Sequence, residues 1–210
     1  MTMKKKILVS ALAIALVAII AVGSLAYFTA STSVTNVFKT TSTDPDQELF
    51  DVDVLEPNAD GEENEFGGHT YEDIVPGSTY KKDPTVVNTG VYDAYVRVTV
   101  TVTKASAWQA ICAKWELDLE DIFGGFDARF ERKSESYDEE NDALTYVYYL
   151  NEPLKAGDSA TLFTTVTIPA VLDNDDMASI SEFDLSVTAD AIQAENTGDN
   201  AFDAFNDYWD

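Results

Sequence analysis

The chain has 210 residues, and its 38 acidic side chains against 13 basic ones give a formal net charge of -25. This length suits one domain with a sizeable core. A hydrophobic content of 45% indicates a folded chain and not an intrinsically disordered one. A surface this acidic repels phosphate, which argues against a nucleic-acid-binding function and against attraction to anionic lipid.

The N-terminus has the three regions of a secretion signal. Lysines at positions 4–6 precede an apolar run over residues 7–22, and small residues follow at positions 24 and 26. This pattern predicts a signal peptide helix over residues 1–26, cleaved between Ala26 and Tyr27. The alternative is an uncleaved anchor, with Tyr27 and Phe28 at the membrane interface. We favour cleavage, so that the signal peptide alone contacts the membrane.

Period-two alternation of apolar and polar residues recurs along the rest of the chain and predicts strands. The clearest case is residues 95–103, where four valines alternate with a mostly threonine face, as in a half-buried antiparallel strand. Similar patterns predict strands over residues 49–57, 143–154, 160–170 and 183–194.

A single stretch, residues 105–123, is convincingly helical and is expected to form a crossover or insertion. Trp108, Ile111, Cys112 and Trp115 share one face of it. Cys112 is the one cysteine of the chain, so no internal disulfide forms. We interpret it as a small buried hydrophobe, not as a nucleophile.

Two polar regions interrupt or follow the strands. Residues 56–73 read as a long acidic loop that carries His69, the one histidine of the chain. The tail, residues 196–210, is acidic but has Phe202, Phe205 and Trp209 at helical spacing, so it is expected to dock on the domain.

Many short strands with Pro and Gly turns between them predict an all-β fold, an antiparallel jelly-roll-like β-sandwich over residues 48–195. Residues 27–47 lie between the predicted cleavage site and this domain.

Four blocks of sequence resemble one family. They are GSLAYFTASTSVTNVFKT, VPGSTYKKDPTVVNTGVYDAYVRVTV, PLKAGDSATLFTTVTIPA and TADAIQAEN. The first resembles the processing region of proteins cut by the SipW-type signal peptidase of Gram-positive bacteria. Together the blocks resemble the TasA/camelysin (CalY) family of biofilm matrix proteins; residues 105–142 carry no such signal.

The resemblance implies a secreted subunit of fibres at the cell surface or in the biofilm matrix. Its partners would be further copies of itself, head to tail, and the SipW-type peptidase. Cleavage would free residues 27–47 as a donor strand that completes a sheet in the next subunit. The assembly residues would be Tyr27, Phe28, Val34, Val37 and Phe38. The alternative is that this segment pairs with its own sheet in a monomer, as in a surface adhesin or binding module.

Camelysin members have been described as zinc metalloendopeptidases, so a protease is a further alternative. The chain has no H-E-x-x-H motif, and His69 stands in an acidic loop with Glu65, Glu72 and Asp73 as possible helpers. We interpret His69 as a solvated loop residue. Residues 58–64 and 173–176 could supply oxygen to calcium but lack EF-hand spacing. We therefore expect no enzyme activity, no cofactor and no metal site.

Overall fold

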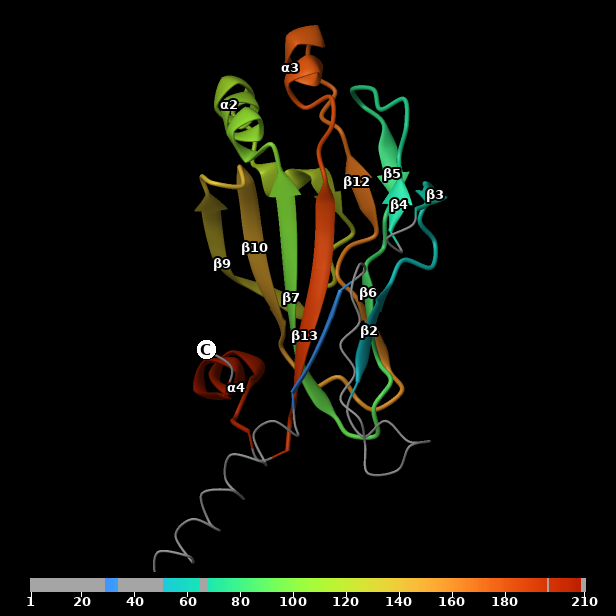
Figure 1. The fold of residues 1–210 in the computed structure, drawn as a ribbon, viewed down its shortest axis with the longest axis vertical. Helices are drawn as coiled ribbons and strands as arrows, with labels where there is room; N and C mark the ends of the chain where they lie inside the picture. Colours follow the sequence, from blue (N-terminus) through green and yellow to red (C-terminus); the bar gives the residue numbers. More distant parts are fainter. Residues whose placement is uncertain (1–28, 34–50, 65–67, 196, 209–210) are drawn as a thin grey trace, which may run out of the picture.

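The computed structural model describes residues 29–33, 51–64, 68–195 and 197–208. Strands dominate these residues and the helices are few and short, which confirms the all-β prediction (Figure 1). Among the helices that the structure describes, none is long and apolar enough to cross a membrane. The predicted signal peptide lies outside the described residues.

The first layer of the fold is a five-stranded antiparallel sheet. Its strand order is β1 (Thr29–Ser33), β13 (Leu185–Gln193), β7 (Ala94–Thr103), β10 (Ala143–Leu150) and β9 (Phe130–Asp138). The predicted valine face is correct, because the alternate residues Val96, Val98, Val100 and Val102 are all completely buried. The threonines of the other face are half-buried. A strand with one face in the core and one toward solvent has this alternation.

The second layer consists of two small sheets. One has the order β11 (Ser159–Thr161), β6 (Thr85–Asn88) and β2 (Val52–Leu55), and the other has β5 (Thr79–Lys81), β12 (Thr165–Thr167) and β8 (Phe123–Gly124). Figure 1 shows β5 and β12 of one above β6 and β2 of the other. The hydrophobic core joins the valines of β7 to Val52, Val86 and Val166 of this layer. The two layers therefore bury one common core. A separate hairpin pairs β3 (Glu62–Glu63) with β4 (His69–Thr70) within the predicted acidic loop.

The single strand predicted over residues 160–170 is wrong. The structure divides it into β11 and β12, which belong to different sheets. Leu162 and Phe163, consecutive in sequence, are both completely buried, so the chain does not continue the period of two there. Phe163 stacks on Phe123 with the ring centroids 4.8 Å apart. This break lets one segment contribute to both small sheets.

The helix predicted over residues 105–123 is shorter in the structure. Helix α2 spans Ala105–Trp115, and a 3-10 turn, η1, follows at Leu119–Ile122. Helix α2 ends because Glu116 takes a left-handed conformation, with φ of 55°, and its N–H donates to the carbonyl of Cys112. The predicted apolar face is confirmed for Trp108 and Ile111, which are buried.

The aromatic tail docks on the domain as expected. Helix α4 (Ala201–Tyr208) lies on the outer face of the five-stranded sheet, where Phe205 is completely buried against Tyr95 and Tyr149 (Figure 1). The guanidinium of Arg97 lies 4.7 Å from the centre of the Phe205 ring. Phe202 remains 41% exposed, and Trp209 lies outside the described residues.

Candidate functional site

The most distinctive feature for function is the edge of the five-stranded sheet formed by β1. Residues Thr29–Ser33 pair antiparallel with residues 188–192 of β13, from Thr29 opposite Ile192 to Ser33 opposite Thr188. The strand belongs to the segment 27–47 that the sequence predicts for assembly. In the structure it pairs with the sheet of its own chain, which is the alternative to assembly that the sequence also allows.

Strand β1 lies where the two layers of the fold meet. Figure 1 shows it in blue, running along the lower part of β13 toward β2. It contacts β2 as well as β13. Along this part of β13, the core-facing residues Val187, Ala189 and Ala191 are at most 1% exposed. Without β1, a row of backbone N–H and C=O groups of β13 would be left unpaired at a sheet edge.

The predicted cleavage residues Ala26 and Tyr27 lie outside the described residues. So do the other predicted assembly residues, Phe28, Val34, Val37 and Phe38. The described β1 falls between Phe28 and Val34, in the first third of the segment 27–47. It lies at the edge of a sheet, where a strand can add by backbone pairing.

A cavity continues the edge beyond the last residue of β1. Within the described residues, no strand pairs with β13 on this side from Leu185 to Val187. A cavity of about 650 Å³ lies there, bounded across from β13 by the strands β5 and β12 and by the β3–β4 hairpin. Its apolar wall includes Ile74, Tyr80, Val166, Ile168, Phe183 and Leu185.

A buried ion-pair cluster forms the polar wall of the same cavity. The Glu56 side chain is 1% exposed, and its carboxylate accepts a hydrogen bond from the ammonium of Lys82, whose side chain is 9% exposed. The second carboxylate oxygen lies 3.2 Å from Nδ1 of His69. Next to them, Asp83 accepts hydrogen bonds from the backbone N–H and the side-chain amide of Asn58, at 3.0 and 2.7 Å. The cluster joins β5 and the β4 hairpin to the end of β2.

The prediction that His69 is a solvated loop residue is therefore wrong. Its side chain is 18% exposed and is held by Glu56, not by the nearby acidic residues Glu72 and Asp73. Glu65 lies outside the described residues. No periodic pattern in the sequence indicates this pairing, because Glu56 comes from the end of β2 and His69 from a hairpin 13 residues later.

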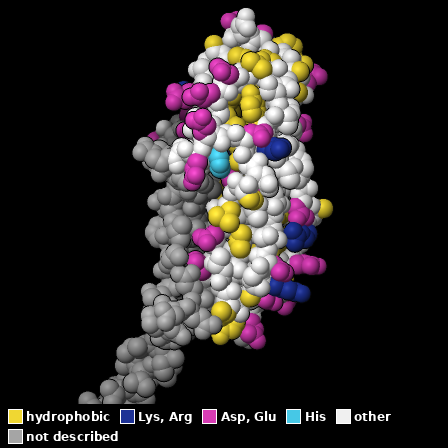
Figure 2. All heavy atoms as spheres, turned by 90° about the vertical axis from the view of Figure 1, so that its right-hand side faces the viewer, with side chains coloured by type: hydrophobic (Ala, Val, Ile, Leu, Met, Phe, Trp, Pro, Cys, Tyr) yellow, Lys and Arg dark blue, Asp and Glu magenta, His cyan; other side chains and the backbone are white. Residues whose placement is uncertain are grey.

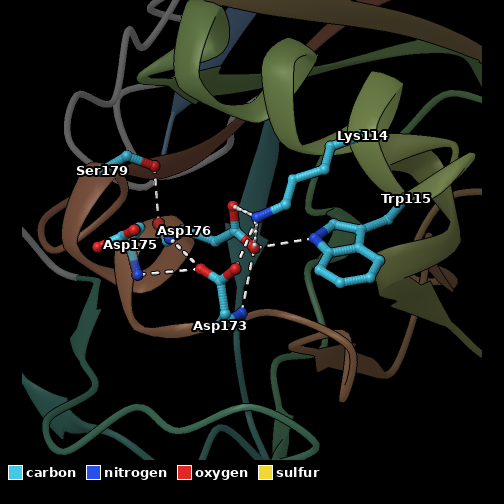
Figure 3. Close-up of polar contacts among 6 residues, drawn as sticks. All are labelled: Lys114, Trp115, Asp173, Asp175, Asp176 and Ser179. Carbon is cyan, nitrogen blue, oxygen red and sulfur yellow. Dashed lines mark hydrogen bonds and ion pairs between the residues drawn. The ribbon is translucent and has the colours of Figure 1, made fainter.

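A second acidic cluster lies at the far end of the molecule, where helix α3 (Asn174–Ser179) meets α2 (Figure 3). The Lys114 ammonium donates to Asp173 at 2.7 Å and to Asp176 at 2.9 Å, and the Trp115 indole N–H donates to Asp176 at 2.8 Å. The hydrogen bonds from Lys114 and then from Trp115 lower the pKa of Asp176 to about 2.

The two segments considered for calcium are occupied by protein contacts. Asp173 caps α3 by accepting from the backbone N–H groups of Asp175 and Asp176 (Figure 3). In the other segment, Asp60 accepts a hydrogen bond from the N–H of Lys81 at 2.7 Å. Across the described part of the chain, no three His, Cys, Asp or Glu side chains are grouped so as to hold a metal ion. These carboxylates act as caps and ion-pair partners.

Cys112 is half-buried and packs against the core cluster from α2. Burial raises the pKa of its thiol, and the nearby Asp118 and Asp121 raise it further. Its packing agrees with the interpretation as a small hydrophobe. A raised pKa keeps the thiol protonated, which is the less nucleophilic form.

The surface is acidic, as the composition predicts. On the face drawn in Figure 2, Asp and Glu side chains are spread widely, whereas Lys and Arg side chains are few. Hydrophobic side chains lie between them on the same face. Two copies of this chain therefore repel each other unless a specific contact offsets the repulsion.

No protein-family model matches this chain, and neither does a curated protein.

Proposed function

We propose that the chain is a secreted structural protein, a subunit of cell-surface or biofilm matrix fibres assembled by donor-strand complementation. In this proposal the fold is a jelly-roll-like sandwich preceded by a cleaved signal peptide helix, and the chain is not an enzyme. The sequence resemblance to the TasA/camelysin family supports it. The observation that carries it is the position of β1 at a sheet edge, inside the segment that cleavage would free.

The geometry supports exchange of this strand between copies. An end segment that pairs only through one edge can be replaced by the same segment of another copy, because the replacement forms identical contacts. The exchange is head to tail, since the donor strand and the acceptor edge are different surfaces of one subunit. A head-to-tail contact that does not close into a ring produces a filament.

The opposite edge of the five-stranded sheet is protected against unspecific pairing. Strand β9 is exposed along almost its whole length and carries Glu131, Arg132, Lys133 and Glu135. Charged side chains on an edge strand oppose the addition of another strand. The β1 side of the sheet is therefore the edge through which strand addition is proposed.

Negative-stain electron microscopy of two purified chains tests the proposal. One begins at Tyr27 and contains the donor segment, and the other begins at Glu48 and lacks it. The proposal predicts filaments from the first chain only. If neither chain forms filaments over a range of pH and calcium concentrations, the protein is a monomer and the adhesin alternative gains support. If both form filaments, assembly uses a different segment.

A further inference from the structure

We propose that the outer face of the five-stranded sheet binds a neutral polysaccharide. The binding surface is made of two neighbouring rows of hydroxyl side chains that cross four strands, with an exposed aromatic ring at its border. This inference goes beyond the proposed function, because binding at this face requires neither assembly nor the donor segment.

The strand register arranges Ser and Thr residues of the sheet in two rows. Residues directly opposite one another on β13, β7, β10 and β9 form the first row, Ser186, Thr101, Thr145 and Ser136. Two residues away along each strand, the second row has Thr188, Thr99, Val147 and Ser134. Opposite residues of an antiparallel pair point to the same face of the sheet, and so do residues i and i+2 of one strand. The Ser and Thr residues of these two rows therefore share one surface, which we call the hydroxyl face.

The hydroxyl face is on the solvent side of the sheet and contains no charged side chain. Its serines are exposed and its threonines are half-buried, whereas the valines that alternate with Thr99 and Thr101 on β7 are buried in the core. The next row along the strands holds Arg97 and Asp190, whose charges face each other across hydrogen bonds of 3.1 and 3.2 Å. The chain has 38 acidic side chains against 13 basic ones, so the hydroxyl face is a neutral area on an acidic protein.

Sheet geometry spaces these hydroxyl groups regularly. Neighbouring strands are about 4.7–4.9 Å apart, and residues i and i+2 are about 6.4–6.8 Å apart along a strand. The Oγ1 atoms of Thr101 and Thr145 lie 3.3 Å apart, so hydroxyl groups of adjacent strands come within hydrogen-bond distance. Each hydroxyl group donates one hydrogen bond and has two acceptor lone pairs. This pair therefore keeps capacity for a ligand that both donates and accepts, as the hydroxyl groups of a sugar do.

An aromatic ring borders the hydroxyl face on the side of helix α4. Phe202 is 41% exposed, and its ring makes a T-shaped contact with Tyr149, with the centroids 5.5 Å apart. Tyr149 follows Val147 by two residues on β10, so the Phe202 ring lies next to the second row. The face of an aromatic ring carries negative potential, which attracts the C–H groups of a sugar ring. The hydroxyl face and Phe202 thus offer the two kinds of contact that a sugar uses, hydrogen bonds and ring stacking.

Charge and polarity select a neutral polysaccharide from the candidate occupants. The acidic surroundings repel a nucleic acid or an anionic polysaccharide. A partner with an apolar surface would meet one half-buried valine here and hydroxyl groups otherwise. A second copy would bring its own acidic surface, including the exposed Asp203 and Asp207 of α4, against the same residues of the first. A neutral chain with repeating hydroxyl groups meets none of these penalties.

Binding to immobilised polysaccharides tests the proposal. The protein is the chain that begins at Tyr27, the probes are the neutral glucans laminarin, dextran and hydroxyethyl cellulose, and polygalacturonate is the anionic control. We expect saturable binding to at least one neutral glucan, with the same affinity at low and high salt, because no ion pair contributes to it. Binding to polygalacturonate should be about tenfold weaker or absent.

Replacing Thr by Val removes a hydroxyl group while preserving the shape and the β-propensity of the side chain. The test variant changes the centre of the hydroxyl face, with Thr99→Val, Thr101→Val and Thr145→Val. The control variant removes the same number of hydroxyl groups from β5 and β12 of the other layer, with Thr79→Val, Thr165→Val and Thr167→Val. We expect the test variant to bind about tenfold more weakly, because several hydrogen bonds are lost. The control variant should bind as the unchanged chain does.

Phe202→Ala tests the aromatic border separately from the sheet. Because Phe202 is exposed on α4, the fold should be preserved, and we expect binding to weaken about fivefold. The proposal is overturned if no neutral glucan binds, or if the test variant and Phe202→Ala both bind as the unchanged chain does. Filament formation by the same variants should be unaffected, so a failure here leaves the proposed function in place.

Discussion

The buried carboxylate of Glu56 offers the sharpest prediction about stability. Replacing it with Gln preserves the shape of the side chain but removes the charge that faces Lys82 and His69. Because the Glu56 and Lys82 side chains are only 1% and 9% exposed, the lysine would keep a largely buried charge without its carboxylate partner. Breaking a buried pair by changing one partner costs about 3–5 kcal/mol of unfolding free energy. We expect Glu56→Gln to lose about 3 kcal/mol, since Gln still accepts a hydrogen bond.

The assay is urea unfolding followed by tryptophan fluorescence, with the slope of the transition compared between variants. A control comes from the neighbouring exposed pair, in which Lys81 and Asp60 lie 4.0 Å apart with side chains 65% and 48% exposed. Asp60→Asn should cost less than about 1 kcal/mol. The double variant Glu56→Gln with Lys82→Met removes both charges and should recover part of the loss. A cost below 1 kcal/mol for Glu56→Gln would refute the reasoning.

Two further predictions concern the helices. Phe205→Ala should weaken the docking of α4 by about 3–5 kcal/mol because Phe205 is completely buried, whereas Phe202→Ala, at a 41% exposed position, should have little effect; hydrogen exchange of α4 measures both. Acid should separate α2 from α3: the pKa of Asp176 is lowered from 3.8 to about 2, so its charge stabilises the fold above pH 4 and this contribution is lost as pH falls toward 2. Trp115 fluorescence should report that change, and Lys114→Met should remove most of the pH dependence.

Each helix prediction has a result that would contradict it. Equal exchange rates in Phe205→Ala and Phe202→Ala would show that α4 is not held by the buried ring. A fluorescence transition centred well above pH 4, or one unchanged in Lys114→Met, would show that another group controls the contact between α2 and α3.

The sequence predicted the elements whose burial follows one simple period. Strand β7 alternates between core and solvent over its whole length, so its valine face could be recognised from spacing alone. The buried face of helix α4 could be predicted in the same way, because the position of Phe205 follows from helical spacing. In both elements, a single flat surface decides which side chains are buried.

Other elements follow no such period and could not be predicted. Strand β9 was missed because it is an exposed, charged edge strand held by backbone pairing with β10. Strands β11 and β12 were predicted as one strand, because the break between them comes from two consecutive buried residues, Leu162 and Phe163. Only the folded chain shows that these two side chains enter the core between different sheets.

The candidate site was predictable only in part. The sequence predicts residues 27–47 as a donor segment, and the described strand β1 lies within that segment. The acceptor edge and the cavity depend on which strand becomes the neighbour of β1, and this is a matter of topology. The same holds for the Glu56 cluster, whose members come together from β2, β4 and the end of β5.

The most direct test of the central claim is a cryo-electron microscopy map of filaments grown from the chain that begins at Tyr27. The decisive observation is the connectivity of the strand that pairs with β13. Donor-strand assembly predicts that this strand continues into β2 of the neighbouring subunit. A strand that continues into β2 of the same subunit, with filaments held by other surfaces, would contradict the account.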